Sequence, residues 1–171
     1  MTASEKPEAW LRGSVDGFEP LLMPVVHALV QVREDLGGLL AWVPEEHVWL
    51  RPGGAASIGF HVRHTAGALD RLLTYARGEA LSAPQLLFLA GEEAPGDPPT
   101  PLSTLVIGVN AVIDRSLAQL RAIEPDRLLD PRQVGRSKLP STVLGLLVHA
   151  AEHSTRHMGQ AITTARILSG G

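Results

Sequence analysis

The sequence contains no cysteine among its 171 residues. This excludes disulfide bonds, thiolate metal ligands and a cysteine nucleophile, so any metal must be held by nitrogen and oxygen ligands, chiefly imidazole. No apolar run is long enough to form a membrane-spanning helix. The first residues, Met-Thr-Ala-Ser-Glu-Lys, lack the basic and then apolar order of a secretory signal peptide. We therefore expect a cytoplasmic protein without a membrane partner.

Several sequence signatures of enzymes are also missing. There is no phosphate-binding P-loop, no GxGxxG and no GxSxG. The zinc-protease motif HExxH is absent as well, because alanine follows His149 and serine follows His153. The net charge of -3 gives no electrostatic reason to expect a nucleic-acid partner.

What the chain does contain is helical periodicity. Hydrophobic residues make up 44% of the sequence, enough for the core of a single domain spanning 1–171. Apolar residues recur at intervals of three and four in four segments, which predict long helices at about 20–43, 57–77, 103–123 and 141–168. A short helix over 82–89 and a lead-in over 1–13 complete the prediction. Ser57, Ser82 and Ser141 are the expected N-caps.

The segments between these helices contain no strand-like alternation. Residues 91–101 and 124–140 are rich in proline, glycine and charged residues, and we expect both to be irregular. The predicted fold class is therefore all-α, a four-helix bundle with long connections. Such connections allow an arrangement other than simple up-and-down neighbours.

Three of the seven histidines, His149, His153 and His157, follow one another at intervals of four residues in the last predicted helix. On a helical wheel they lie roughly 160°, 120° and 80° from the centre of the apolar stripe. The apolar stripe consists of Val143, Leu147, Ala151, Met158, Ala161, Ala165 and Leu168. His153 and His157 therefore flank the buried face together, whereas His149 points elsewhere.

A third ligand is expected from another helix, and the second predicted helix offers His61 and His64. The wheel places His61 at about 70° and His64 at about 130° from the main stripe, so it slightly favours His61 without deciding. Three neutral imidazoles suit zinc, nickel, iron or copper and leave open positions for water or substrate. Each ring also needs an acceptor for its second nitrogen. The nearby polar candidates are Glu152, Gln160, Ser57 and Asp70.

Two segments together resemble the DinB/YfiT-like family. One is Ser57-Ile-Gly-Phe-His-Val-Arg-His64, with a histidine seven residues after the capping serine, and the other is His153-Ser-Thr-Arg-His157-Met-Gly-Gln160. The resemblance covers nearly the whole chain and implies a bundle that forms homodimers and holds a divalent metal, with zinc, nickel or iron as candidates. Carried over by position, it implies His64, His153 and His157 as ligands. One departure is Met158, where many relatives have arginine, while Arg156 precedes His157 here.

The resemblance also implies a function. The better understood relatives include transferases and an isomerase that use low-molecular-weight thiols such as bacillithiol or mycothiol. We therefore expect a metal-dependent enzyme, possible reactions being thiol transfer or hydrolysis, in stress response or detoxification. Tyr75, Arg71 and Arg156 are the expected substrate contacts, with Gln160 supporting the ligands. The alternative is a non-catalytic metal-binding stress protein or a dimeric interaction module, in which Glu152, His149 or His61 closes the site as a fourth ligand.

Overall fold

The computed structural model describes residues 6–170. Residues 1–5, which belong to the predicted lead-in and to the stretch compared with a signal peptide, lie outside the described residues, and so does Gly171. The fold is mostly helical, which confirms the predicted all-α class. Five α-helices follow one another along the chain: α1 (Met23–Trp42), α2 (Ile58–Ala76), α3 (Ala83–Ala90), α4 (Leu102–Arg121) and α5 (Val143–Leu168). Short 3₁₀ helices occupy Ala9–Arg12, Pro20–Leu22, Glu45–His47, Pro52–Gly54 and Pro125–Arg127.

Helix starts follow side-chain capping, with one difference from the prediction. The hydroxyl of Ser57 accepts a hydrogen bond from the backbone N–H of Phe60 at 3.1 Å, and Ser82 caps α3. The cap of α5 is Thr142 rather than Ser141, since its hydroxyl accepts from the N–H of Gly145 at 3.0 Å. Ser141 was a wrong prediction because α5 begins at Val143, so the residue directly before the helix is Thr142.

A short hairpin is the main correction to the sequence analysis. Residues 124–140 were predicted to be irregular, but strand β1 (Pro131–Val134) pairs antiparallel with β2 (Leu139–Thr142). Four-residue strands that each contain a proline are too short to show an alternating pattern. The hairpin leads directly into α5, because β2 ends at Thr142 and α5 begins at Val143. The N–H of Leu144 donates to the carbonyl of Leu128 at 2.8 Å, which joins the start of α5 to the segment before the hairpin.

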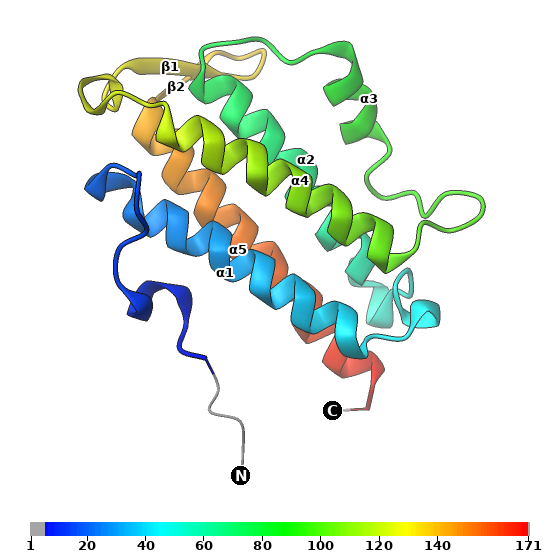
Figure 1. The fold of residues 1–171 in the computed structure, drawn as a ribbon. Helices are drawn as coiled ribbons and strands as arrows, with labels where there is room; N and C mark the ends of the chain where they lie inside the picture. The colour runs from blue at the N-terminus through cyan, green and yellow to red at the C-terminus, as the bar shows by residue number, and fades with distance from the viewer. Residues whose placement is uncertain (1–5, 171) are drawn as a thin grey trace.

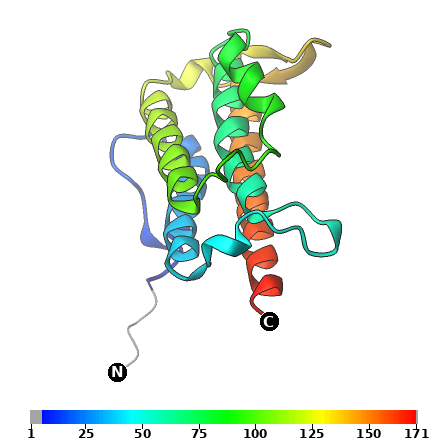
Figure 2. The ribbon, with the colours of Figure 1, turned by 90° about the vertical axis from the view of Figure 1, so that its right-hand side faces the viewer.

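The four long helices form a bundle in which α1 and α5 run in one direction and α2 and α4 in the other (Figure 1). Helix α2 packs against α5 and α4, and α1 packs against the same two helices. The consecutive helices α1 and α2 are therefore diagonal across the bundle. The neighbours α2 and α4 run in the same direction, so the chain between them, which includes α3 and the predicted connection 91–101, must return along the bundle. Figure 2 shows the short helix α3 outside the bundle, beside α2.

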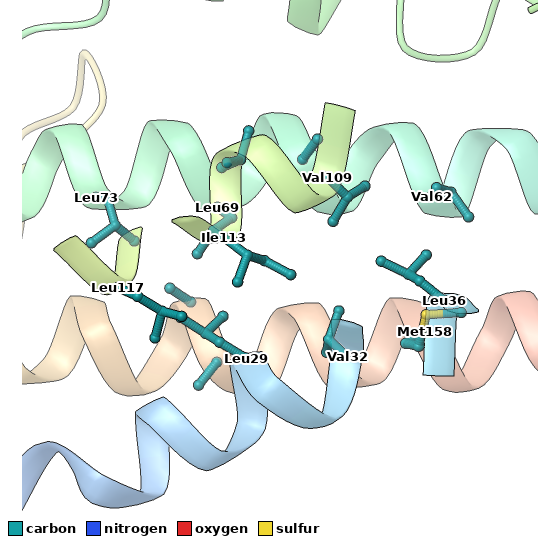
Figure 3. Packing of buried hydrophobic residues seen from close by; sticks show 14 of the residues in the cluster. Leu29, Val32, Leu36, Val62, Leu69, Leu73, Val109, Ile113, Leu117 and Met158 are labelled. Carbon is teal, nitrogen blue, oxygen red and sulfur yellow. The ribbon is translucent and has the colours of Figure 1, made fainter. Parts of the chain in front are cut away.

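The core runs along the bundle axis. Leucine, isoleucine and valine side chains from all four long helices meet there, and Met158 of α5 lies among them (Figure 3). Leu36, Val109 and Ile113 are 0% exposed. Helix α5 packs against both α1 and α2, and its buried residues include Leu147, Ala151, Met158 and Ala161. No helix in residues 6–170 has the combination of length and apolar character needed to cross a membrane.

Candidate metal centre

Three histidines from two antiparallel helices, α2 and α5, meet between these helices. His64 of α2 and His153 and His157 of α5 each offer one ring nitrogen, and these three atoms lie within 4.8 Å of one another. The ring centroid of His157 lies 4.4 Å from that of His64 and 4.5 Å from that of His153. All three side chains are partly buried. This is the set that the family resemblance implied.

Helix geometry explains the set. His153 and His157 are one turn apart, so they project from the same flank of α5 toward α2. His149 lies one further turn back, and its side chain is 52% exposed, where it faces Glu152 at 3.5 Å. His149 does not join the cluster, in agreement with its position on the helical wheel, roughly 160° from the centre of the apolar stripe.

A buried carboxylate orients His64. Oε2 of Glu92 lies 2.6 Å from Nδ1 of His64. A carboxylate only accepts, so Nδ1 carries the proton and the lone pair on Nε2 faces His153 at 2.9 Å. Metal-binding histidines commonly donate their second nitrogen to a carboxylate in this way. Glu92 was not predicted to belong to the site, because it lies in an irregular acidic connection. Only the fold brings Glu92 to α2.

Glu92 reaches this position because α2 has a glycine opposite it. A Cβ on Gly67 would overlap Oε1 of Glu92 and would lie 2.6 Å from a guanidinium nitrogen of Arg71. Arg71 donates to Oε1 of Glu92 at 2.6 Å, so the buried carboxylate has a charged partner on one oxygen and His64 on the other. Glu92 is 3% exposed.

The loop that carries Glu92 is hydrogen-bonded to Arg63, near the start of α2. The guanidinium of Arg63 lies 4.7 Å from the ring centre of Trp49 and donates to the carbonyls of Gly91 and Ala94. The indole N–H of Trp49 donates to the carbonyl of Thr100 at 2.9 Å. These contacts fix both ends of the connection between α3 and α4.

His61 lies behind His157 rather than in the cluster. It is 6% exposed, and its Nδ1 is 3.0 Å from Nδ1 of His157. One of the two nitrogens must donate to the other. If His157 binds through Nε2, its Nδ1–H donates to His61, which then acts as the acceptor that holds the ring. The wheel placed His61 nearer the core correctly, but this position makes it a supporting residue.

The electrostatics of the site favour neutral imidazoles. Burial, followed by the neighbouring His64 and His153, lowers the pKa of His157 to about 4. Burial and then His64 lower the pKa of His153 and of His61. Metal ligation requires the neutral ring, so these residues need not lose a proton near pH 7 to act as ligands.

The donor set fits a divalent transition-metal ion. His64 and His153 turn their Nε2 atoms toward each other at 2.9 Å, and their rings share the space with His157. Nδ1 of His153 is buried without a hydrogen-bond partner among the described residues. No fourth histidine, aspartate or glutamate of residues 6–170 belongs to the group. Three imidazoles with a carboxylate behind one of them are typical of sites that keep an open position.

The remaining predicted site residues lie elsewhere. Arg71 contacts Glu92 rather than the histidine cluster. Arg156 is exposed and bonded to Glu152, and Gln160 is exposed without a hydrogen bond within the described chain. Tyr75 lines an open hollow between α3 and the hairpin. Met158, where many relatives have arginine, is 2% exposed and packs in the core.

The fold and the cluster together define a class of protein, a four-helix bundle with a three-histidine candidate metal centre between its second and last long helices. The sequence model of the DinB superfamily matches residues 28–161, a span that includes all three histidines and Glu92. The chain belongs to the DinB superfamily. No curated protein shows significant sequence similarity to it.

Proposed function

We propose that this protein binds one divalent metal ion through His64, His153 and His157 and uses it to activate a small nucleophile. Zinc, nickel and iron are the candidates, because imidazole ligands suit all three. The observation that carries the proposal is the convergence of three ring nitrogens within 4.8 Å on rigid helices, with Glu92 orienting one ring.

An ion held there would act as a Lewis acid, lowering the pKa of a low-molecular-weight thiol or of water near neutral pH. The protein's own contribution is positional. Glu92 keeps the proton of His64 on Nδ1 through one carboxylate oxygen, and Arg71 donates to the other oxygen of Glu92. With an ion on Nε2 of His157, His61 would accept from Nδ1–H of His157. These contacts orient the rings of His64 and His157.

The reaction we propose is transfer of a thiol to an electrophile or hydrolysis, in stress response or detoxification, by a homodimer. Membership of the DinB superfamily and the lack of a fourth protein ligand within residues 6–170 support an open, reactive site. The test is turnover by metal-loaded protein across a panel of thiols, electrophiles and esters. Absence of both thiol binding and turnover contradicts the enzymatic proposal.

One observation favours the alternative, a metal-binding protein without catalysis. Neither the hollow beside α4 nor the hollow beside the hairpin is lined by any of the three histidines. Neither hollow therefore offers a substrate pocket next to the cluster. Metal binding that stabilises the fold, together with no turnover on the same panel, selects this alternative.

Metal binding itself is tested by elemental analysis of protein purified without an affinity tag. We expect one ion per chain in the wild type and loss of metal in His64→Ala, His153→Ala and His157→Ala. The matched controls are His149→Ala and His61→Ala, which should retain the ion when metal is in excess. Retention in His64→Ala with loss in His61→Ala overturns the ligand assignment on α2.

His61 has a further test that separates a supporting role from no role. His61→Phe keeps an aromatic ring but removes the acceptor for Nδ1 of His157. Loss of such a supporting partner lowers metal affinity by about tenfold to a hundredfold. An unchanged dissociation constant contradicts the proposed support.

A further inference from the structure

A cavity of about 460 Å³ lies between α2, α3 and α4, and none of the three clustered histidines lines it. Its walls are mainly apolar and include Ala66, Phe88, Leu105 and Val112. Gly108 of α4 also lines the cavity, and a Cβ added there would meet no atom within 4 Å. This volume is in the range of pockets that hold small organic ligands.

One charged group is buried in the wall of this cavity. Arg71 is 8% exposed and lines the cavity, yet only one of its three guanidinium nitrogens has a partner, the carboxylate of Glu92. No hydrogen bond within residues 6–170 uses the other two nitrogens, and neither is sealed from solvent-accessible space. A guanidinium with unused donors beside an apolar wall is suited to a planar anion.

The other charged side chains around the cavity determine whether it favours an anionic or a cationic ligand. Arg63 is engaged by the Gly91 carbonyl and by Thr100, so it has little capacity for a ligand. Arg115 lies at the mouth, 63% exposed, with Asp70 at 3.6 Å. Asp70 also accepts from Gln85 at 2.7 Å. The free donors are therefore those of Arg71 in the wall and Arg115 at the rim.

We propose that this cavity binds a small carboxylate with an aromatic or branched aliphatic body. The carboxylate accepts from the unused nitrogens of Arg71, and the body lies against Phe88, Leu105 and Val112. The site is distinct from the metal centre, from which Glu92 separates it, and the proposal does not depend on metal binding.

Isothermal titration of the metal-loaded full-length protein with phenylpropionate and with phenylpropionamide tests this proposal. The two probes have the same body, and only the acid carries a charge. We expect the acid to bind at least about tenfold more tightly than the amide, because the amide offers a weaker acceptor to a guanidinium. Arg71→Gln should remove this preference while leaving amide binding unchanged.

A second variant keeps the proposal testable if Arg71→Gln fails to fold. Gly108→Leu fills the cavity from an open helical position and should abolish binding of both probes, with metal content unchanged. The matched control is Gly37→Leu, at an exposed helical glycine of α1 that also has no atom within 4 Å of its Cβ position. It should bind both probes as the wild type does.

Three results overturn the proposal. They are equal affinity for acid and amide in the wild type, unchanged binding in Gly108→Leu, and no binding of the acid at all. A change from dimer to monomer in Gly108→Leu, measured by sedimentation, instead assigns the cavity to an interface between copies of the chain.

Discussion

Gly67 provides the sharpest test of how the metal centre is positioned. Alanine at this position adds a Cβ that overlaps the carboxylate of Glu92 and approaches Arg71 and Phe88 at 2.6 and 2.8 Å. Glycine inside a helix is less favourable than alanine by about 1 kcal/mol. Its presence in the middle of α2 is explained by the close approach of Glu92.

The magnitudes of the Gly67→Ala effects separate stability from metal binding. Helix propensity contributes a gain of about 1 kcal/mol, and overpacking in a filled site costs about 1–3 kcal/mol. The metal-free variant should therefore be destabilised by roughly 0–2 kcal/mol. Displacement of Glu92 releases Nδ1 of His64, which should lower metal affinity by about tenfold to a hundredfold, equivalent to about 1.4–2.7 kcal/mol.

The assay is competition of the protein with a chromophoric zinc chelator, combined with urea unfolding of the metal-free form. Glu92→Gln should lower affinity by a similar factor, and the double variant should be no worse than either single variant, because both changes break the same contact. Gly37→Ala is the matched control and should gain about 0.4–1 kcal/mol without any effect on affinity. Additive losses, or a Gly67→Ala affinity within about twofold of the wild type, refute the role of Glu92.

Other predictions concern the frame around the site. Gly59→Ala should lower the free energy of unfolding by about 1–3 kcal/mol, since its Cβ would lie 2.7 Å from the ring of Trp49. Leu36→Ala should cost about 2–5 kcal/mol in the same urea assay. Arg12 holds the pKa of Glu34 below its usual value, so this pair stabilises the fold above pH 4.5 and is lost as the pH falls through the folded-state pKa. Glu34→Gln should cost up to about 1 kcal/mol at pH 7, and the difference from the wild type should vanish in acid.

Much of the bundle was predictable because the sequence features that determine a helix, its apolar spacing and its cap, lie within the helix itself or next to it. Helical spacing placed α2 within one residue at each end, and Ser57 marked its start. The orientation of His153 and His157 follows from the geometry of one helix, and so does the exclusion of His149. The hairpin was missed because its strands are four residues long and their pairing depends on contacts across the turn.

The choice between His61 and His64 was not decidable from the helical wheel, because both lie on flanks of α2. What separates them is the partner each one meets. His64 faces a carboxylate from a connection 28 residues further along the chain, and His61 faces the back of His157. Neither contact leaves a periodic pattern. The offset from Ser57 selects the histidine that the structure places beside His153 and His157, because a family motif reflects the whole folded arrangement. Its role as a ligand stays a prediction.

Burial and ligation make opposite demands on a histidine at such a site. A ligand needs one nitrogen held by the protein and the other turned toward a position that water or substrate can reach. His64 meets both demands at the edge of the bundle, with its side chain 18% exposed, while the more deeply buried His61 meets only the first. The connection between α3 and α4 then matters as much as the helices, since it supplies the acceptor that fixes His64. The candidate metal centre is therefore formed by α2, α5 and this connection, and a change at Gly67 should alter it without touching any of the three histidines.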